Sequence, residues 1–287
     1  MELGYRRVIT QAICAVLILC GLIGAGRLWD GRAQMAFGEA DGVRLPILMY
    51  HSILKDGARQ GKYVLHPDAL ASDLDYLKKE GYETITVNDL LAYVGEGTPL
   101  PDKPVMITFD DGYYNNYVYA YPLLQERGMR AVVSIIGSQT ALYTENGQEN
   151  AYWSHLKLTH LGEMDDVFEV QNHSWNLHEY GERRGCLRRR GEDQVGYASF
   201  LRQDTEATQQ LLIEAGLPEP TCYTYPFGAC SDESEKVLKD MGFQCTLGCE
   251  ERVNTVTRDP DCLYEMGRFN RPAGVSTDTF MEKLKKE

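Results

Sequence analysis

Two aspartates and two histidines are the side chains of this 287-residue chain best suited to carry out chemistry. Asp110 and Asp111 directly follow the apolar run at residues 105–109, and His173 and His178 occupy the segment NHSWNLH. Carboxylate oxygens and neutral imidazole nitrogens are typical ligands of zinc-like ions, and a set of three protein ligands leaves one position open for water. The residue types therefore indicate a metal site with a place for water.

The spacing of these residues favours turns at the ends of strands over a regular helix. Two histidines five positions apart lie about 140° apart around a helix, so they can share a ligand only on a strand-to-loop turn. Gly112 lets the chain turn directly after Asp111, and the active sites of α/β barrels lie at the carboxyl ends of strands. Each motif alone also fits a solvated turn or a structural histidine. Their combination is what favours a metal site.

Short apolar runs alternate along the chain with segments of helical periodicity. Strands are predicted at residues 45–50, 82–86, 105–109, 131–136, 168–171, 221–225 and 243–247. Helices are predicted at residues 66–81, 87–94 with Asn88 as cap, 116–126, 154–164, 197–215 and 231–241. Repeated β–α units with short connections predict an α/β fold with a parallel sheet, either open or closed into a barrel.

An uncharged apolar run, Val8–Gly26, stands near the amino terminus behind Arg6 and Arg7. As a helix it covers roughly 28 Å, close to the thickness of the hydrocarbon core of a bilayer. The two arginines favour an amino terminus in the cytoplasm. We therefore expect one transmembrane helix that leaves the rest of the chain outside. A cleaved signal peptide is the alternative, and it also exports the remainder.

The predicted organisation is a membrane anchor at residues 1–26, a linker at 27–44 and one domain at 45–287. The formal net charge is −13, from 29 basic and 42 acidic residues, which argues against a nucleic-acid partner. The part after the linker contains six cysteines, an even number that allows disulfides in an oxidising compartment without revealing their pairing. They are Cys186, Cys222, Cys230, Cys245, Cys249 and Cys262.

Three motifs together resemble the polysaccharide deacetylase family, the family 4 carbohydrate esterases that share the NodB homology domain. They are TFDDG at Thr108–Gly112, NHSWNLH at Asn172–His178 and TYPFG at Thr224–Gly228. PILMYHSI at Pro46–Ile53 further resembles the branch of poly-N-acetylglucosamine deacetylases. The resemblance extends over roughly residues 45–271 and implies a distorted (β/α) barrel of the NodB type.

The resemblance also implies a role for each matching residue. Asp110 corresponds to the general base and the backbone at Phe227 to part of the oxyanion site. The implied metal ligands are Asp111, His173 and His178, which would hold one divalent ion. Zn²⁺ is the first expectation, and Co²⁺, Ni²⁺ or Mn²⁺ suit the same nitrogen and oxygen donors.

Three features depart from the family pattern. His173 and His178 are five positions apart, as in the branch just named, whereas many members of the family have a spacing of four. The turn that often begins with arginine begins here with Thr224, and Arg268 in EMGRFNRP is the candidate for the missing positive charge near Asp110. The family's usual general-acid histidine lies late in the chain, whereas no histidine follows His178 here. His51, in the MYHS segment, is the natural substitute, although it also fits a buried residue at a strand end.

The sequence thus predicts a single-pass, extracytoplasmic, metal-dependent hydrolase that removes N-acetyl groups from a cell-surface polysaccharide. Poly-N-acetylglucosamine and peptidoglycan both fit as substrates. Two alternatives stay open. One is an esterase that removes O-acetyl groups with the same metal and base. The other is a catalytically weak protein that only binds glycan, which the missing late histidine would explain. If the apolar run is cleaved, the protein is secreted.

Overall fold

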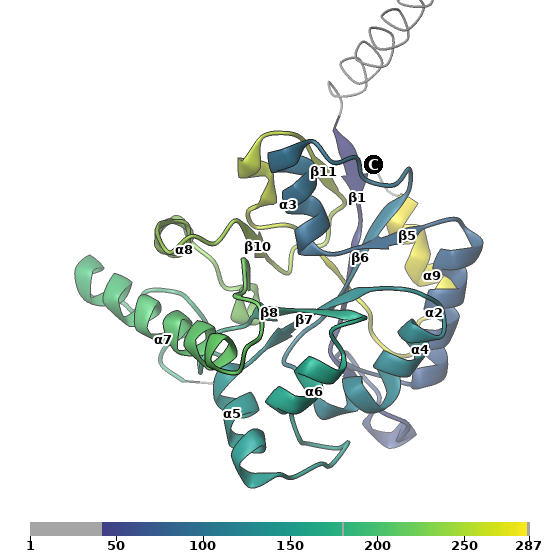
Figure 1. Ribbon diagram of the computed structural model, residues 1–287, viewed down its shortest axis with the longest axis horizontal. Coiled ribbons are helices and arrows are strands. Elements are labelled where there is room, and N and C mark those ends of the chain that lie inside the picture. The colour runs from purple at the N-terminus through teal and green to yellow at the C-terminus, as the bar shows by residue number, and fades with distance from the viewer. Residues whose placement is uncertain (1–41, 180, 286–287) are drawn as a thin grey trace, which may run out of the picture. The chain divides into compact units, whose positions relative to one another are not determined.

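Eight parallel strands form the central sheet of this computed structural model, which describes residues 42–179 and 181–285 (Figure 1). The strand order is β10-β9-β8-β7-β6-β2-β12, and β5 pairs with the first half of β6 where β7 pairs with the second half. The strands are β2 (Ile47–Tyr50), β5 (Glu83–Ile85), β6 (Pro104–Phe109), β7 (Ala131–Ile135), β8 (Phe168–Asn172), β9 (Cys222–Thr224), β10 (Cys245–Leu247) and β12 (Phe269–Asn270).

The sheet is a distorted half-barrel. Its edge strands β10 and β12 are not paired with each other. An isolated bridge between Leu247 and Met266, and a hydrogen bond from Arg268 N–H to the Glu250 carbonyl, join the segments beside them. Two small sheets complete the described strands. β1 (Val43–Leu45) pairs antiparallel with β11 (Asn254–Val256), and β3 (Ser52–Ile53) pairs parallel with β4 (Val64–Leu65). The expected parallel α/β architecture is present, but the sheet does not close into a full barrel.

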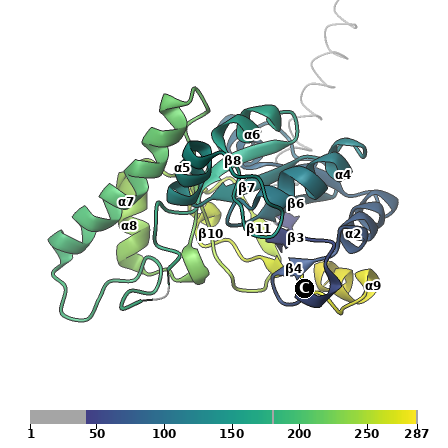
Figure 2. The ribbon, with the colours of Figure 1, turned by 90° about the horizontal axis from the view of Figure 1, so that it is seen from below.

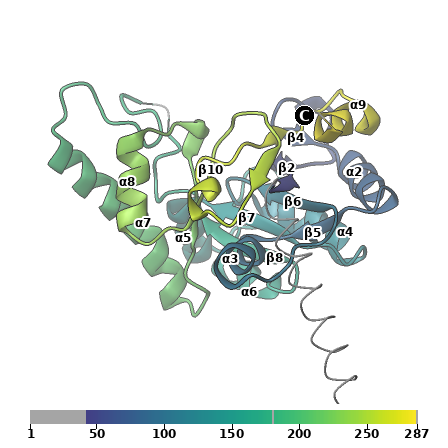
Figure 3. The same ribbon diagram turned by 90° about the horizontal axis from the view of Figure 1, so that it is seen from above.

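Helices flank the sheet. Seen from below and from above, α7 lies beside α8 at one side of the sheet, and α2 lies beside α9 at the other (Figures 2 and 3). The α-helices are α2 (Pro67–Lys79), α3 (Val87–Glu96), α4 (Tyr121–Gln125), α5 (Gly137–Asn146), α6 (Leu158–Glu163), α7 (Gln194–Glu214), α8 (Asp232–Asp240) and α9 (Thr277–Met281). Shorter helical turns are η1 (Gly57–Arg59), the π-helical η2 (Asn116–Ala120), η3 (Pro226–Gly228), η4 (Pro260–Leu263) and η5 (Glu282–Lys285).

Apolar side chains cover both faces of the central strands. Successive side chains of a strand point to opposite faces, so Ile107 and Phe109 of β6 join one core cluster while Met106 joins another. Leu48 and Ile47 of β2 divide in the same way. A parallel sheet buried on both faces is what the near-continuous apolar runs predict. Its rigid strands fix the residues that follow their carboxyl ends.

Three local predictions were wrong. The helix expected at residues 154–164 is shortened to α6, because the backbone at Ser154 and Leu156 bonds instead to Tyr114 and Gly112. Helix α5 was not predicted at all. Thr86, not Asn88, occupies the amino-terminal cap of α3, where its N–H donates to the Asp89 carboxylate at 2.7 Å.

The predicted anchor at residues 1–26 and nearly all of the predicted linker lie outside the described residues. Strand β1 begins at Val43, within the range assigned to the linker. Within the part of the chain that the structure describes, no helix is long and apolar enough to cross a membrane. The six cysteines of that part are all free thiols, so none of the disulfides that their even number allows is formed.

Candidate active site

Asp110 is the first residue after β6, and its carboxylate is held by a fully buried arginine. Arg268 donates two parallel hydrogen bonds to it, from Nη1 to Oδ1 at 2.7 Å and from Nη2 to Oδ2 at 2.8 Å. The same guanidinium also donates to Thr108 Oγ1 and to the carbonyl of Gly248. Burial alone would raise the pKa of Asp110, but the charge and hydrogen bonds of Arg268, together with the nearby imidazoles, outweigh burial and hold the pKa below its usual value. Asp110 is therefore a buried, ionised carboxylate.

Asp111 leaves the strand in the left-handed region, with φ of 70°. Gly112 continues the turn with φ of 69°, and a Cβ at that position would lie 2.9 Å from Ile135 Cγ2. Only glycine fits this close approach, so the turn requires Gly112 after the two aspartates. The turn sends the Asp111 carboxylate toward the loop that follows β8.

Asp111, His173 and His178 form a compact cluster whose candidate ligand atoms all lie within 4.8 Å of one another. Asp111 Oδ1 is 3.5 Å from His173 Nε2 and 3.4 Å from His178 Nε2. This buried oxygen has no hydrogen-bond partner among the described residues, which is costly unless a further group binds there. One carboxylate oxygen and two imidazole nitrogens suit a single divalent ion. The cluster therefore fits the predicted metal site.

His173 and His178 differ in their exposure to solvent. His173 is buried, whereas the side chain of His178 is 25% exposed, so the cluster is reached from the His178 side. Burial would lower the pKa of His173, but the neighbouring Asp111 and Asp110 carboxylates raise it above its usual value. For His178, burial lowers the pKa. The pKa of Asp111 lies well below its usual range because nearby imidazoles outweigh its burial.

A network of hydrogen bonds orients the histidine loop. His173 Nδ1 lies 2.7 Å from the carbonyl oxygen of Thr224, which leaves Nε2 free to face Asp111. The Asp204 carboxylate of α7 accepts hydrogen bonds from the backbone N–H groups of Trp175 and Asn176, at 2.9 and 3.0 Å. The ligand geometry therefore depends on α7 as well as on the strand ends.

Phe227 lies in the turn after β9, with φ of 59° and its ring centroid 4.3 Å from that of His178. Four non-glycine residues of the described chain have positive φ, and three of them, Asp111, Ser174 and Phe227, belong to the turns around the cluster. Such conformations cost of order 1–3 kcal/mol each and gather at functional sites. Their concentration here supports the assignment of these turns as the active site.

His51 lies between β2 and β3, on the Asp110 side of the site. Its Nε2 is 3.9 Å from Asp110 Oδ2, and its Nδ1 has no hydrogen-bond partner among the described residues. Burial lowers the pKa of His51, and the neighbouring carboxylates offset this only in part. The imidazole is therefore neutral at rest and stands next to the candidate base.

The structure brings all seven residues singled out in the sequence into one site: His51, Asp110, Asp111, His173, His178, Phe227 and Arg268. Two neighbours had not been singled out. Asp204 gave no signal because it lies in the middle of a helix. His155 stacks on Tyr113 with ring centroids 4.9 Å apart, and burial lowers its pKa to about 4. His155 comes near the site because the segment before α6 is a loop, whereas the sequence predicted a helix there.

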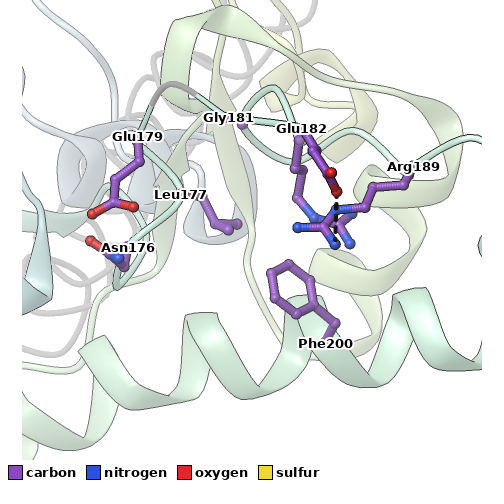
Figure 4. A pocket seen from close by; sticks show the side chains of 9 residues that line it. Asn176, Leu177, Glu179, Gly181, Glu182, Arg189 and Phe200 are labelled. Atoms are coloured by element: carbon purple, nitrogen blue, oxygen red, sulfur yellow. Dashed lines mark ion pairs between the residues drawn. The ribbon is translucent and has the colours of Figure 1, made fainter.

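A separate hollow of about 150 Å³ adjoins the histidine loop (Figure 4). Asn176 and Leu177 contribute to one wall, Phe200 of α7 to another, and Glu182 and Arg189 form an ion pair at 3.9 Å across it. None of the three clustered ligand residues lines this hollow. It is a neighbouring surface feature and not the site of the chemistry.

The cluster makes a direct prediction about metal content. His173→Ala and His178→Ala are each expected to lose most of the bound divalent ion, because two remaining ligands rarely hold such an ion tightly. Elemental analysis of the purified protein measures this. His66→Ala, at the amino-terminal cap of α2, is the matched control and should keep its metal. Unchanged stoichiometry in both cluster variants would rule out this site.

Fold and site together define a hydrolase on a parallel half-barrel, with a donor set that suits one divalent metal ion. The chain belongs to the polysaccharide deacetylase family, whose profile matches residues 97–246, just over half of its length. YxkH of Bacillus subtilis is 25% identical over 238 residues, which cover 83% of this chain and 75% of that protein. Membership of the family makes the protein a polysaccharide deacetylase.

A second relative is the poly-beta-1,6-N-acetyl-D-glucosamine N-deacetylase of Escherichia coli. It is 23% identical over 218 residues, which cover 68% of this chain but only 32% of that enzyme. This chain thus spans about a third of the length of the E. coli protein. A solved structure of a de-N-acetylase from Aggregatibacter actinomycetemcomitans superposes with a TM-score of 0.72 at 21% identity, over 84% of this chain and all of that one. This likeness shows the same fold.

Proposed function

We propose that the protein removes N-acetyl groups from a polysaccharide of the cell surface, with N-acetylglucosamine units as the acetylated sugars. The observation that carries the proposal is the Asp111–His173–His178 cluster, with the buried carboxylate of Asp110 on the adjacent residue. The preference for N-acetyl over O-acetyl groups is supported by the name of the E. coli relative. Poly-N-acetylglucosamine and peptidoglycan are the candidate polymers. A single-pass membrane location with the domain outside stays a prediction.

In the proposed mechanism Asp111, His173 and His178 hold one divalent ion, with zinc as the first candidate. When bound, such an ion lowers the pKa of a water to roughly 7 and polarises a carbonyl group. Asp110 accepts the proton of the attacking water, since its carboxylate is ionised and fixed by Arg268. The backbone turn at Phe227 supplies donors for the developing oxyanion.

The leaving amine needs a proton before the carbon–nitrogen bond breaks. His51 is the proposed donor, because its imidazole lies in the site on the Asp110 side. The neutral imidazole of His51 must itself receive a proton before it can donate one. The proposed source is Asp110, the nearest carboxylate that gains a proton during the reaction. His51 in this position also supplies the acid that the missing late histidine would provide, which argues against a protein that only binds glycan.

Acetate release from a set of purified polymers tests the proposal. With a divalent ion present, we expect release from poly-β-1,6-N-acetylglucosamine or peptidoglycan and little from O-acetylated xylan. Residual acetyl groups counted by NMR give an independent readout. Release from the O-acetylated polymer alone would make the protein an esterase. Binding without any release would show that it acts only as a glycan-binding protein.

A further inference from the structure

Three exposed aromatic side chains lie in two loops that contact residues of the active site. The described residues include four aromatic side chains that are more than a third exposed: Tyr63, Tyr152, Trp153 and Phe200. Trp153 is the most exposed of them, at 55%. Phe200 lies on α7 at the separate hollow, whereas Tyr63 lies in the loop before β4 and the other two lie in the turn before α6. We call Tyr63, Tyr152 and Trp153 the aromatic rim.

The loop that carries Tyr152 and Trp153 is fastened to the turn that carries the aspartates. The N–H of Tyr114 donates to the carbonyl of Ser154 at 2.8 Å, and the N–H of Leu156 donates to the carbonyl of Gly112 at 2.7 Å. Gly112 directly follows Asp111. The exposed rings are therefore tied through short backbone connections to a candidate metal ligand.

The aromatic rim also contacts His51, on the Asp110 side of the site. The Tyr63 ring centroid is 4.7 Å from that of His51, and the Arg59 guanidinium lies 5.4 Å from the centre of the Tyr152 ring. The buried amide of Asn115 joins the two sides, because its Nδ2 donates both to Ser52 Oγ at 2.8 Å and to the carbonyl of Ala151 at 2.9 Å. The two loops thus contact each other, one beside His51 and the other bonded to the turn of Asp111.

Hydrogen bonds fix the backbone of the turn that carries Tyr152 and Trp153. Asn150 and Ser154 close their turn with three hydrogen bonds of 2.9 Å: Asn150 N–H to Ser154 Oγ, Ser154 N–H to the Asn150 carbonyl, and Tyr152 N–H to Asn150 Oδ1. The carbonyl of Trp153 accepts a hydrogen bond from Tyr143. These bonds fix the backbone from which the two aromatic side chains extend into solvent, which lowers the entropic cost of binding a partner.

We propose that the aromatic rim binds the sugar rings that flank the acetylated unit at the metal cluster. A pyranose ring has an apolar face of C–H groups and an edge of hydroxyl groups. Aromatic rings stack on the first, while tyrosine hydroxyls and the Arg59 guanidinium bind the second. This rests on the proposed function, since the occupant is the same polysaccharide. The rim would make the protein select chains over single sugars.

Binding of a pentasaccharide of β-1,6-linked N-acetylglucosamine tests the rim separately from turnover. Calorimetric titration of the full-length protein in the Asp110→Asn background prevents cleavage. Adding Trp153→Ala should raise the Kd by roughly tenfold, the scale for truncating one aromatic anchor. Trp153→Phe keeps a stacking face and should stay within about twofold. Phe200→Ala is the control with similar chemistry outside the rim and should leave the Kd unchanged.

Kinetics with Asp110 intact provide the second readout. Trp153→Ala and Tyr152→Ala should each raise KM for the polymer while kcat, metal content and Tm stay close to the wild type. An equal fall in kcat and metal content would mean that the loop only supports the site, and would overturn the proposal.

The outcomes also separate the rim from the proposed function. Acetate release by the wild type with a Kd unaffected by Trp153→Ala would refute the rim alone. Binding that depends on Trp153 without acetate release from any polymer would refute the function alone. If Trp153→Ala instead reduces binding to lipid vesicles or dissociates an oligomer, with glycan binding intact, the rim serves another partner and the proposal fails.

Discussion

Asp110→Asn is expected to lower the rate of acetate release by roughly 100-fold or more while the metal content stays nearly constant. The asparagine amide keeps the shape of the side chain but cannot accept the proton of the attacking water, and loss of a general base typically costs 10²–10⁴-fold. The metal should remain because Asp111, not Asp110, belongs to the ligand cluster. Initial rates on the preferred polymer, with parallel metal analysis, measure both quantities.

Asp111→Asn is the matched control, because it changes the same chemical group on the adjacent residue. It should lose metal and activity together. If Asp110→Asn lost the metal instead, the two aspartates would have exchanged roles. Full turnover by Asp110→Asn would assign the base to another group.

Strand ends were the part of the fold that the sequence predicted best. The run at residues 105–109 is strongly apolar, and β6 spans Pro104–Phe109. A buried parallel strand needs little beyond such a run, so its boundary can be read locally. The positions of Asp110 and Asp111 at its carboxyl end followed directly. The paired histidines after β8 were predictable for the same reason.

Contacts between distant segments were harder to predict. Arg268 and Asp110 are 158 positions apart, and only comparison with the family pattern suggested that they meet. Helix α5 gave no apolar periodicity, because its buried residues are only Gly137 and Thr140. The role of Asp204 depends on how α7 packs against the histidine loop. Each of these features arises from tertiary packing, which a single sequence does not display.

Arg268→Met is expected to destabilise the fold by about 3–5 kcal/mol, the usual cost of removing one partner of a buried ion pair. Methionine roughly fills the volume of the arginine stem but leaves the Asp110 carboxylate buried without its two charged donors. Urea unfolding followed by circular dichroism measures the loss. The rate of acetate release per folded molecule should also fall, because Asp110 loses the contacts that fix its position and its charge.

The chain contains a matched control for this variant. Arg271 is also buried and donates hydrogen bonds to the buried Asp73 at 2.7 and 3.1 Å, and neither residue belongs to the metal cluster. Arg271→Met should destabilise the fold by a similar amount but keep the rate per folded molecule. Equal losses of rate in the two variants would attribute the effect to instability and not to the active site.

The double variant Asp110→Asn with Arg268→Met tests how much of the lost stability comes from the unpaired charge of Asp110. If the main cost of Arg268→Met is an unpaired carboxylate, replacing that carboxylate by a neutral amide should restore part of the lost stability. The double variant is then more stable than Arg268→Met alone, although both are inactive. Additive destabilisation would show instead that Arg268 acts through its packing and its bonds to Thr108 and Gly248, with no energetic coupling to Asp110.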